Sequence, residues 1–336
     1  MPALCLLTPG TSAYLKGERL IVEVPPEEEG GEFKSGDIPL RDIDSVTITE
    51  HVAFTMPALA ECLRRDIPVV ITWRGERILG TCLPPAPHSA ARLLQYKRVL
   101  DPGFSLAVAA SSIRTKIGNE RRVLQRLASN RSGVDVSKAL EFLAQIAGRC
   151  DSAASVDALR GNEGAAAAAY FEALAQFFPE DCPFERRSRR PPHNAANAVL
   201  SFAYTILGAE IECQIVAAGL DPALGFLHET EDRRPSLALD LMEPFRAPIA
   251  DGLALDLLGH QTLRPEAHFE KRDGGVYLNP EGRKRFFVGY ERRMNRDFFS
   301  EQRQRRTTLR NELRQEAILL KQTVVDGTAF EPFVMN

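Results

Sequence analysis

The chain has 336 residues, of which 44% are hydrophobic and 26% are charged, so it can bury a full core and a wholly disordered chain is excluded. A membrane span is also excluded, because the longest apolar run, residues 195–209, is interrupted by Asn197, Ser201 and Thr205 and falls short of the ~20 residues required. This length predicts two domains more readily than one.

The formal net charge of -3 conceals an uneven distribution of charge. The segment from Glu18 to Asp44 contains nine acidic and three basic residues. The segment from Lys271 to Arg310 contains twelve basic and five acidic residues. We therefore expect a polyanion such as DNA to bind the C-terminal half.

The N-terminus lacks the basic residues and the small-residue cleavage site of a signal peptide, which predicts a cytoplasmic protein without membrane contact. The six cysteines are scattered and form no CxxC pair, so neither a zinc site nor a disulfide scaffold is expected.

The first ninety residues are predicted to form short strands and turns. Runs rich in β-branched residues indicate strands at 20–24, 46–49 and 69–73. A helix is expected from Met56, because Pro57 falls in its first turn, where a missing N–H costs nothing. The proline-rich stretch 83–88 favours an extended connection.

Beyond residue 90 the pattern is helical. Spacing typical of helices occurs at 91–100, 105–127, 136–147, 162–178 and 195–216. A last helix runs from about Leu309 until Gly327 ends it. We predict an α+β fold with a small β-rich N-terminal domain (1–85), a linker (86–95) and a larger all-α C-terminal domain (96–336).

Phosphate-binding and hydrolase motifs of the types GxxxxGK[ST], GxGxxG and GxSxG do not occur in the sequence. Acidic residues near one histidine remain: Asp240 and Glu243 would share a helix face, and His228 precedes them. Oxygen ligands with one imidazole suit a hard divalent ion such as Mg²⁺ or Mn²⁺. A solvated helix face is the simpler interpretation of the same pair.

Three further features have both a functional and a structural interpretation. Glu163 could bind a metal ion. It also follows Asn162, a typical N-cap residue, so the helix dipole alone could favour an acid there, in the first turn of a helix. Asn197, Ser201 and Thr205 form a polar stripe that could face an active site or make ordinary helix-to-helix hydrogen bonds. The basic cluster 186–190 suits phosphates or is merely solvated.

Four segments occur in a characteristic order: Arg160-Gly-Asn-Glu-Gly, Pro192-His-Asn-Ala-Ala-Asn-Ala-Val-Leu-Ser-Phe-Ala-Tyr, Gly219-Leu-Asp-Pro-Ala-Leu-Gly-Phe-Leu-His and Ser236-Leu-Ala-Leu-Asp-Leu-Met-Glu-Pro-Phe-Arg. Together they resemble the CRISPR-associated spacer integrase family, the first-numbered Cas protein, over essentially the whole chain. Lys116-Ile-Gly-Asn119 and Gly327-Thr-Ala-Phe-Glu-Pro-Phe also resemble family patterns.

The resemblance implies an N-terminal domain that forms a homodimer and a C-terminal domain that holds one divalent metal. It implies Glu163, His228 and Glu243 as the metal ligands, with Asp240 as a catalytic neighbour that helps to hold or tune the site. Family positions and basic composition also give a candidate DNA-binding set: Asn197, Arg186, Arg187, Arg189, Arg190, Arg246, Arg283, Lys284, Arg285, Arg292 and Arg293. The chain departs from the family at Asn194-Ala195, where Asp-Pro is common, and at Glu120, where an amide is common.

The implied reaction is transesterification, in which the 3′-hydroxyl of a captured DNA fragment attacks a phosphodiester at the border of a CRISPR repeat with Mg²⁺ or Mn²⁺ as cofactor. The implied partners are DNA, the small second-numbered Cas protein and, where present, the fourth-numbered Cas nuclease. Two alternatives stay open: a DNA-binding scaffold that has lost catalysis, and a general metal-dependent nuclease that needs neither partner nor repeat.

Overall fold

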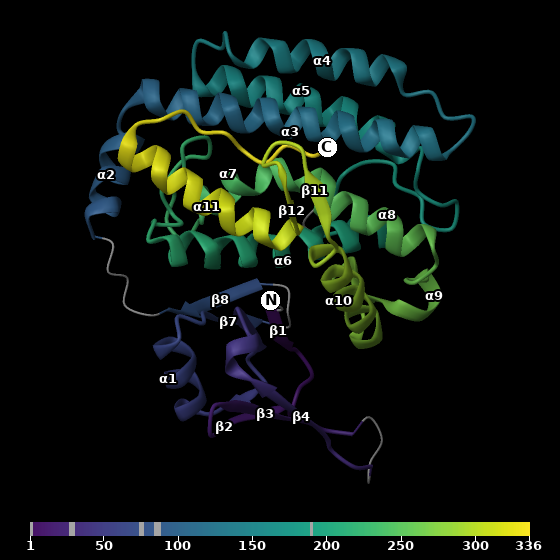
Figure 1. Cartoon of the computed structure of the whole chain (residues 1–336). Coiled ribbons are helices and arrows are strands. Elements are labelled where there is room, and N and C mark those ends of the chain that lie inside the picture. Colours follow the sequence, from purple (N-terminus) through teal and green to yellow (C-terminus); the bar gives the residue numbers. More distant parts are fainter. Residues whose placement is uncertain (1–2, 27–30, 74–76, 84–88, 189–190) are drawn as a thin grey trace. The chain divides into compact units, whose positions relative to one another are not determined.

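The computed structural model describes residues 3–26, 31–73, 77–83, 89–188 and 191–336 (Figure 1). The chain forms two units, Met1–Ser89 and Ala90–Asn336. Strands dominate the first unit and helices the second, so the fold is a mixed α/β fold with N-terminal strands and a helical C-terminal region.

Two four-stranded sheets form the N-terminal unit. One has the order β1-β5-β7-β8, with β8 antiparallel to β7 and the other pairs parallel. The second has the order β4-β3-β2-β6. The strands are β1 (Ala3–Leu6), β2 (Ser12–Lys16), β3 (Arg19–Val24), β4 (Lys34–Pro39), β5 (Ser45–Thr49), β6 (Ala53–Phe54), β7 (Val69–Trp73) and β8 (Arg77–Cys82).

Helix α1 (Met56–Arg64) contacts β2 of one sheet and β7 of the other. Its side chains Ala58 and Cys62 are buried with Leu20, Val46 and Val69 from the strands, because β-branched and small residues pack closely on a pleated surface. The three strands and the helix that the sequence predicts in this region are thus confirmed.

The C-terminal unit is built mainly of helices. They are α2 (Ser89–Val99), α3 (Pro102–Asn130), α4 (Ser137–Cys150), α5 (Val156–Ala175), α6 (Ala195–Ala218), α7 (Ser236–Met242), the 3₁₀ turn η2 (Glu243–Phe245), the π-helical turn η3 (Arg246–Asp251), α8 (Gly252–Gly259), α9 (Pro265–His268), α10 (Pro280–Met294) and α11 (Leu309–Asp326). Helices α3, α4 and α5 pack on one another in a layer (Figure 1), and α3 also contacts η2 and η3.

Helix α6 lies in the core of this unit, against α7, α8, α11 and η3. By length and composition it could cross a membrane, but most of its side chains are buried inside the unit. Asn194 caps its first turn by accepting a hydrogen bond from the Asn197 N–H, and Gly219 ends it with a φ of 86°. It is a core helix, as the sequence predicts.

The prediction that the C-terminal domain is all-α is wrong. Two antiparallel hairpins interrupt its helices, formed by β9 (Phe269–Arg272) with β10 (Gly275–Leu278) and by β11 (Phe298–Ser300) with β12 (Arg305–Thr307). Asp273 and Gly274 connect β9 to β10 with φ values of 50° and 73°. This Asp-Gly pair favours a two-residue hairpin turn, and strands of three or four residues carry too little periodicity to be seen in the sequence.

The predicted linker, residues 86–95, is also partly wrong. Residues 86–88 lie outside the described residues, and residues 89–95 belong to α2. Ser89-Ala-Ala-Arg follows the last proline and consists of residues that a helix tolerates well. Within the C-terminal unit, Gln95 is fully buried and donates hydrogen bonds to the carbonyls of Asp221 and Leu224, which ties α2 to the segment before His228.

Candidate metal centre

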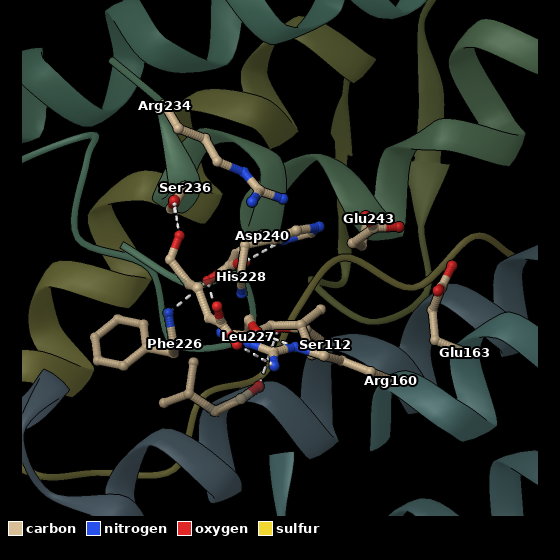
Figure 2. Close-up of polar contacts among 12 residues, drawn as sticks. Ser112, Arg160, Glu163, Phe226, Leu227, His228, Arg234, Ser236, Asp240 and Glu243 are labelled. Atoms are coloured by element: carbon tan, nitrogen blue, oxygen red, sulfur yellow. Dashed lines mark hydrogen bonds and ion pairs between the residues drawn. The ribbon is translucent and has the colours of Figure 1, made fainter. Parts of the chain in front are cut away.

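Asp240 organises the loop that carries His228. One of its carboxylate oxygens, Oδ2, accepts the backbone N–H groups of Phe226 (2.5 Å) and Leu227 (2.9 Å). The other, Oδ1, accepts the backbone N–H of His228 (2.9 Å) and lies 2.7 Å from its Nδ1 (Figure 2). When the proton of the neutral imidazole lies on Nδ1 and is held by Asp240, Nε2 keeps its lone pair and could bind a metal ion.

Gly225 permits this loop to close around Asp240. A Cβ at position 225 would lie 2.8 Å from Oδ2 of Asp240 and 2.9 Å from the carbonyl oxygen of His228, closer than carbon and oxygen normally approach. The loop therefore requires glycine at this position for steric reasons.

His228 shares a pocket of ≈ 350 Å³ with the two other predicted ligands, Glu163 and Glu243. Glu163 projects from α5 and Glu243 from η2, directly after α7 (Figure 2). The complete lining consists of Arg160, Glu163, Leu227, His228, Glu229, Arg234 and Glu243. Asp240 and Glu243, which the sequence places on one helix face, thus have different partners: Asp240 binds the loop and Glu243 faces the pocket.

The structural interpretation of Glu163 as a first-turn residue is wrong. Helix α5 begins at Val156, with the Ser155 side chain accepting a hydrogen bond from the Ala158 N–H. Glu163 is therefore the eighth residue of α5, beyond the first turn in which the helix dipole would favour an acid. The helix dipole therefore does not explain the acidic residue at this position.

A buried lysine, for which the sequence predicts no role, bridges the two glutamates. The ammonium Nζ of Lys116, from α3, contacts Oε1 of Glu163 and lies 2.8 Å from Oε2 of Glu243. The pKa of Lys116 would fall on burial, but its three glutamate neighbours raise it above the usual value, so the side chain is charged. The third neighbour, Glu120, is 4.0 Å away.

The electrostatic environment separates the pKa values of the two buried acids next to Lys116. Burial favours the protonated form of Glu243, but the charges of Arg246 and Lys116 outweigh burial and lower its pKa to about 2. Burial instead raises the pKa of Glu120 to about 8, in spite of Lys116. Glu243 is therefore an anion at neutral pH, as a metal ligand must be.

The donor set fits a hard divalent ion. Two carboxylates and one imidazole line one pocket, and a cation, the Lys116 ammonium, already lies between the carboxylates. In the part of the chain that the structure describes, no three side chains of the His, Cys, Asp or Glu type converge closely enough to ligate an ion as they stand. The two carboxylates contact the Lys116 ammonium instead.

Arg246 contacts one of the predicted metal ligands within the chain. Its Nε is 3.0 Å from Oε2 of Glu243, and its guanidinium lies 4.9 Å from the centre of the Tyr204 ring. The hydroxyl groups of Tyr204 and Tyr170 both donate to the buried carboxylate of Asp251. This network holds Arg246, and through it Glu243, in place, while the DNA contact expected of Arg246 stays a prediction.

Asn197 and Arg187 likewise bind within the chain. Asn197 is 1% exposed, and its side chain accepts from the Ser188 N–H and the Arg187 guanidinium and donates to the Arg186 carbonyl. Arg187 also donates to Ser201, so the polar stripe of α6 anchors the segment before the helix. A direct DNA contact by Asn197 is excluded in this conformation.

Of the other basic residues predicted to bind DNA, some are partly buried and others are exposed. Arg283 donates to the Leu278 carbonyl, and Arg293 donates to the carbonyl of Pro248 and to the Asp256 carboxylate. Arg189 and Arg190 lie outside the described residues. The exposed candidates are Arg186, Lys284, Arg285 and Arg292.

Comparison with known proteins agrees with the resemblance. A family model described as "CRISPR associated protein Cas1" matches residues 4–292. A "CRISPR-associated endonuclease Cas1 3" from Thermus thermophilus is 34% identical over 300 residues, which cover 89% of this chain and 88% of the relative. A "CRISPR-associated exonuclease Cas4/endonuclease Cas1 fusion" from Rhodospirillum rubrum is 36% identical over 88% of this chain and 51% of the fusion.

Solved structures share the fold. A "Casposase bound to integration product" has a TM-score of 0.88 at 22% identity, covering 100% of this chain and 95% of that one. A "Cas6-RT-Cas1--Cas2 complex" has a TM-score of 0.79 at 25% identity, covering 99% of this chain and 36% of that one.

Proposed function

The chain belongs to the Cas1 family of CRISPR-associated proteins, and on that premise we propose that it is a metal-dependent DNA integrase and endonuclease of CRISPR adaptation. In this role it joins the 3′-hydroxyl ends of a short captured DNA fragment to the borders of a CRISPR repeat. The observation that carries the proposal is the common pocket of Glu163, His228 and Glu243, two carboxylates and an imidazole contributed by three separate segments.

Glu163, Glu243 and Nε2 of His228 would hold Mg²⁺ or Mn²⁺ in this pocket. When bound, the ion supplies Lewis-acid polarisation of the phosphate and lowers the pKa of the attacking hydroxyl. The chain supplies the orientation: Asp240 fixes the imidazole, and Arg246 keeps Glu243 ionised. Such outer partners of metal ligands set ligand geometry and basicity.

Arg160 and Arg234 give the pocket positive charge for a phosphodiester. Arg160 donates two hydrogen bonds to the Leu227 carbonyl, at 2.7 and 3.0 Å, and pairs with Glu229 at 2.9 Å. Arg234 lines the same pocket and pairs with Glu231 on the surface at 2.7 Å. A guanidinium at the pocket can bind phosphate oxygens through two parallel hydrogen bonds and so position the scissile phosphorus.

The reaction exchanges one phosphodiester for another. The fragment's 3′-oxygen attacks the phosphorus at the repeat border, a new P–O bond forms, and the bond to the 3′-oxygen of the flanking strand breaks. Water in place of the 3′-hydroxyl gives hydrolysis, which is the endonuclease activity. Holding the fragment end and the target phosphate together in the pocket supplies most of what such a reaction needs from a protein.

DNA outside the pocket would be bound by the exposed basic residues Arg186, Lys284, Arg285 and Arg292. Their contacts with phosphates are electrostatic, so DNA affinity should fall steeply as salt rises.

The proposed assembly is a homodimer, formed by the N-terminal unit, that works with the small second-numbered Cas protein. A "Cas6-RT-Cas1--Cas2 complex" is named among the structures that share this fold, and a Cas4 fusion is named among the relatives. A fourth-numbered Cas nuclease that trims the fragment is thus a further proposed partner.

A strand-transfer assay tests the proposal. A short duplex with free 3′-hydroxyl ends is incubated with a supercoiled plasmid carrying a CRISPR repeat, the candidate small partner and Mn²⁺ or Mg²⁺. We expect covalent joining that requires metal and is lost in Glu163→Gln and Glu243→Gln, while Glu172→Gln, on the same helix as Glu163 but absent from the pocket lining, retains it. Full joining by both pocket variants would overturn the site; salt-sensitive binding without joining would favour a scaffold.

A further inference from the structure

Lys116 occupies a position that a bound metal ion would need. Its side chain is 5% exposed, and its ammonium is shared between Glu163 and Glu243, the two carboxylates proposed to bind the ion. A divalent ion binds carboxylate oxygens at about 2.0–2.1 Å, whereas the ammonium is held by the same oxygens at hydrogen-bond distance. Two cations so close together repel strongly in a buried site, so the ammonium must leave when the ion arrives.

Glu120 offers the displaced ammonium a new partner. Its side chain is 3% exposed, and its Oε2 has no hydrogen-bond partner although it is buried. Its other oxygen, Oε1, lies 4.0 Å from the Lys116 nitrogen. Buried carboxyl oxygens seldom stay unpaired, so Glu120 can accept a further hydrogen bond beside the site.

The transfer needs only a side-chain movement. Lys116 and Glu120 are four residues apart on α3, so they are neighbours on one face of the helix. A shift of roughly 1 Å brings the nitrogen from 4.0 Å to ordinary hydrogen-bond distance of Oε1 of Glu120, in the same carboxyl group as the unpartnered Oε2. The flexible lysine stem can supply that shift while α3 remains packed against α4 and α5.

We propose that Lys116 is the resident cation of the metal-free centre and that Glu120 receives its ammonium when a divalent ion binds Glu163 and Glu243. This inference rests on the proposed metal site and adds an exchange step to it.

Two substitutions in the full-length chain separate the two halves of the exchange. Glu120→Gln keeps the size of the side chain and the Lys116 bridge but gives the displaced ammonium no carboxylate. We expect its melting temperature in EDTA not to fall, and its dissociation constant for Mn²⁺ to rise roughly 5- to 100-fold, the usual range of coupling between two sites. Lys116→Met removes the competing cation, so its dissociation constant for Mn²⁺ should fall at least about fivefold.

The measurements are calorimetric titration with MnCl₂ alone, without DNA, and thermal unfolding with EDTA or Mn²⁺. Glu316→Gln is the matched control, because Glu316 is also a fully buried glutamate with an unpartnered oxygen but binds the Phe333 N–H and does not line the pocket. It should bind Mn²⁺ like the wild type. If Lys116→Met does not fold in EDTA, Glu120→Gln, which keeps the ammonium, decides the question.

The outcomes distinguish the exchange from the metal site itself. Wild-type Mn²⁺ binding that is abolished by Glu163→Gln but unchanged in Glu120→Gln would overturn the exchange alone. Weaker Mn²⁺ binding by Lys116→Met would also overturn it, because the lysine would then support the metal and not compete with it. A wild-type chain that binds no Mn²⁺ would overturn the metal site and, with it, the exchange.

Discussion

The rings of Phe245 and Phe333 stack with their planes 4° apart and their centroids 4.9 Å apart. Phe245 ends η2, the turn that begins with Glu243, whereas Phe333 is the fourth residue from the C-terminus. Both rings are almost completely buried. The C-terminal segment therefore packs directly against the turn that positions a proposed metal ligand.

Asn119 joins the same two segments by hydrogen bonds. Its side-chain nitrogen donates to the carbonyls of Pro244 (2.7 Å) and Phe333 (2.9 Å), and its oxygen accepts from the Met335 N–H (2.8 Å). One amide thus fixes η2 and the C-terminal segment to α3, one turn along from Lys116.

We expect Asn119→Ala to lower the free energy of unfolding by about 3 kcal/mol, because three buried backbone groups lose their partner. Since Pro244 follows Glu243, Mn²⁺ affinity should fall as well. Urea unfolding and Mn²⁺ titration measure the two effects. Asn295→Ala, an exposed asparagine in the same unit, is the control; equal stability of the two variants would contradict the role of Asn119.

Asp240→Asn should weaken metal binding without removing a ligand. The carboxylate accepts three backbone N–H groups and the His228 ring, and an amide would turn one of these acceptors into a donor that faces donors. We expect Mn²⁺ affinity to fall roughly 10- to 100-fold, the usual effect of losing an outer partner of a ligand. Calorimetric titration measures it, with the exposed Asp151→Asn as the control.

An unchanged Mn²⁺ affinity in Asp240→Asn would mean that His228 is oriented by other contacts. A complete loss of binding would instead indicate that Asp240 is a ligand itself.

The sequence predicts those parts of the site that lie in short contiguous segments. His228, Asp240 and Glu243 fall within sixteen residues, and their spacing on a helix and loop indicates a polar centre. The strands of the N-terminal unit are likewise visible in their β-branched runs, because that pattern is local.

The sequence does not predict the role of Lys116, because the two glutamates that it bridges, Glu163 and Glu243, are distant from it in the sequence. The residue lies on a helix surrounded by Ile113 and Ile117, and its contact with Glu163 spans 47 positions. A lysine on an apolar helix face is a local signal of a buried charge, but only the packing of α3 against α5 and η2 identifies the acids that pair with it. The sequence likewise does not predict that Asn197, a candidate DNA-binding residue, is buried, because burial depends on tertiary contacts.

Glu316 predicts a change of stability with pH. Burial raises its pKa to about 8, although the Phe333 N–H that it accepts favours the charged form. Because the folded state binds this proton more tightly than the unfolded state, the stabilisation is complete below pH 4.5 and is lost as the pH rises to about 8. Glu316→Gln cannot ionise and escapes that loss.

The difference in unfolding free energy between Glu316→Gln and the wild type should therefore grow in favour of the variant from pH 5 to pH 8, by a few kcal/mol at most. Urea unfolding at several pH values in EDTA measures this difference. A constant difference across the range would show that Glu316 titrates normally. Glu172→Gln serves as the control, since Glu172 is exposed on α5.

Arg292 and Arg293 are neighbours on α10 with opposite predicted roles. Arg292 is exposed, whereas Arg293 donates to the Pro248 carbonyl at 2.8 Å and to Asp256 at 2.5 Å. A Cβ at Gly252 would lie 2.1 Å from the Arg293 guanidinium, so this side chain fills the space that glycine leaves beside η3. We therefore expect Arg292 to contribute to DNA binding and Arg293 to the stability of the fold.

Arg292→Ala should lower DNA affinity a few-fold and reduce the slope of log affinity against log salt by about 1, because one phosphate contact is lost. Arg293→Ala should instead cost about 2 kcal/mol of unfolding free energy, because the charged hydrogen bond to Pro248 is lost. Fluorescence anisotropy with labelled duplex at several salt concentrations and urea unfolding separate the two effects. A stable Arg293→Ala variant with the larger loss of DNA affinity would reverse the assignment and place Arg293 at the DNA-binding surface.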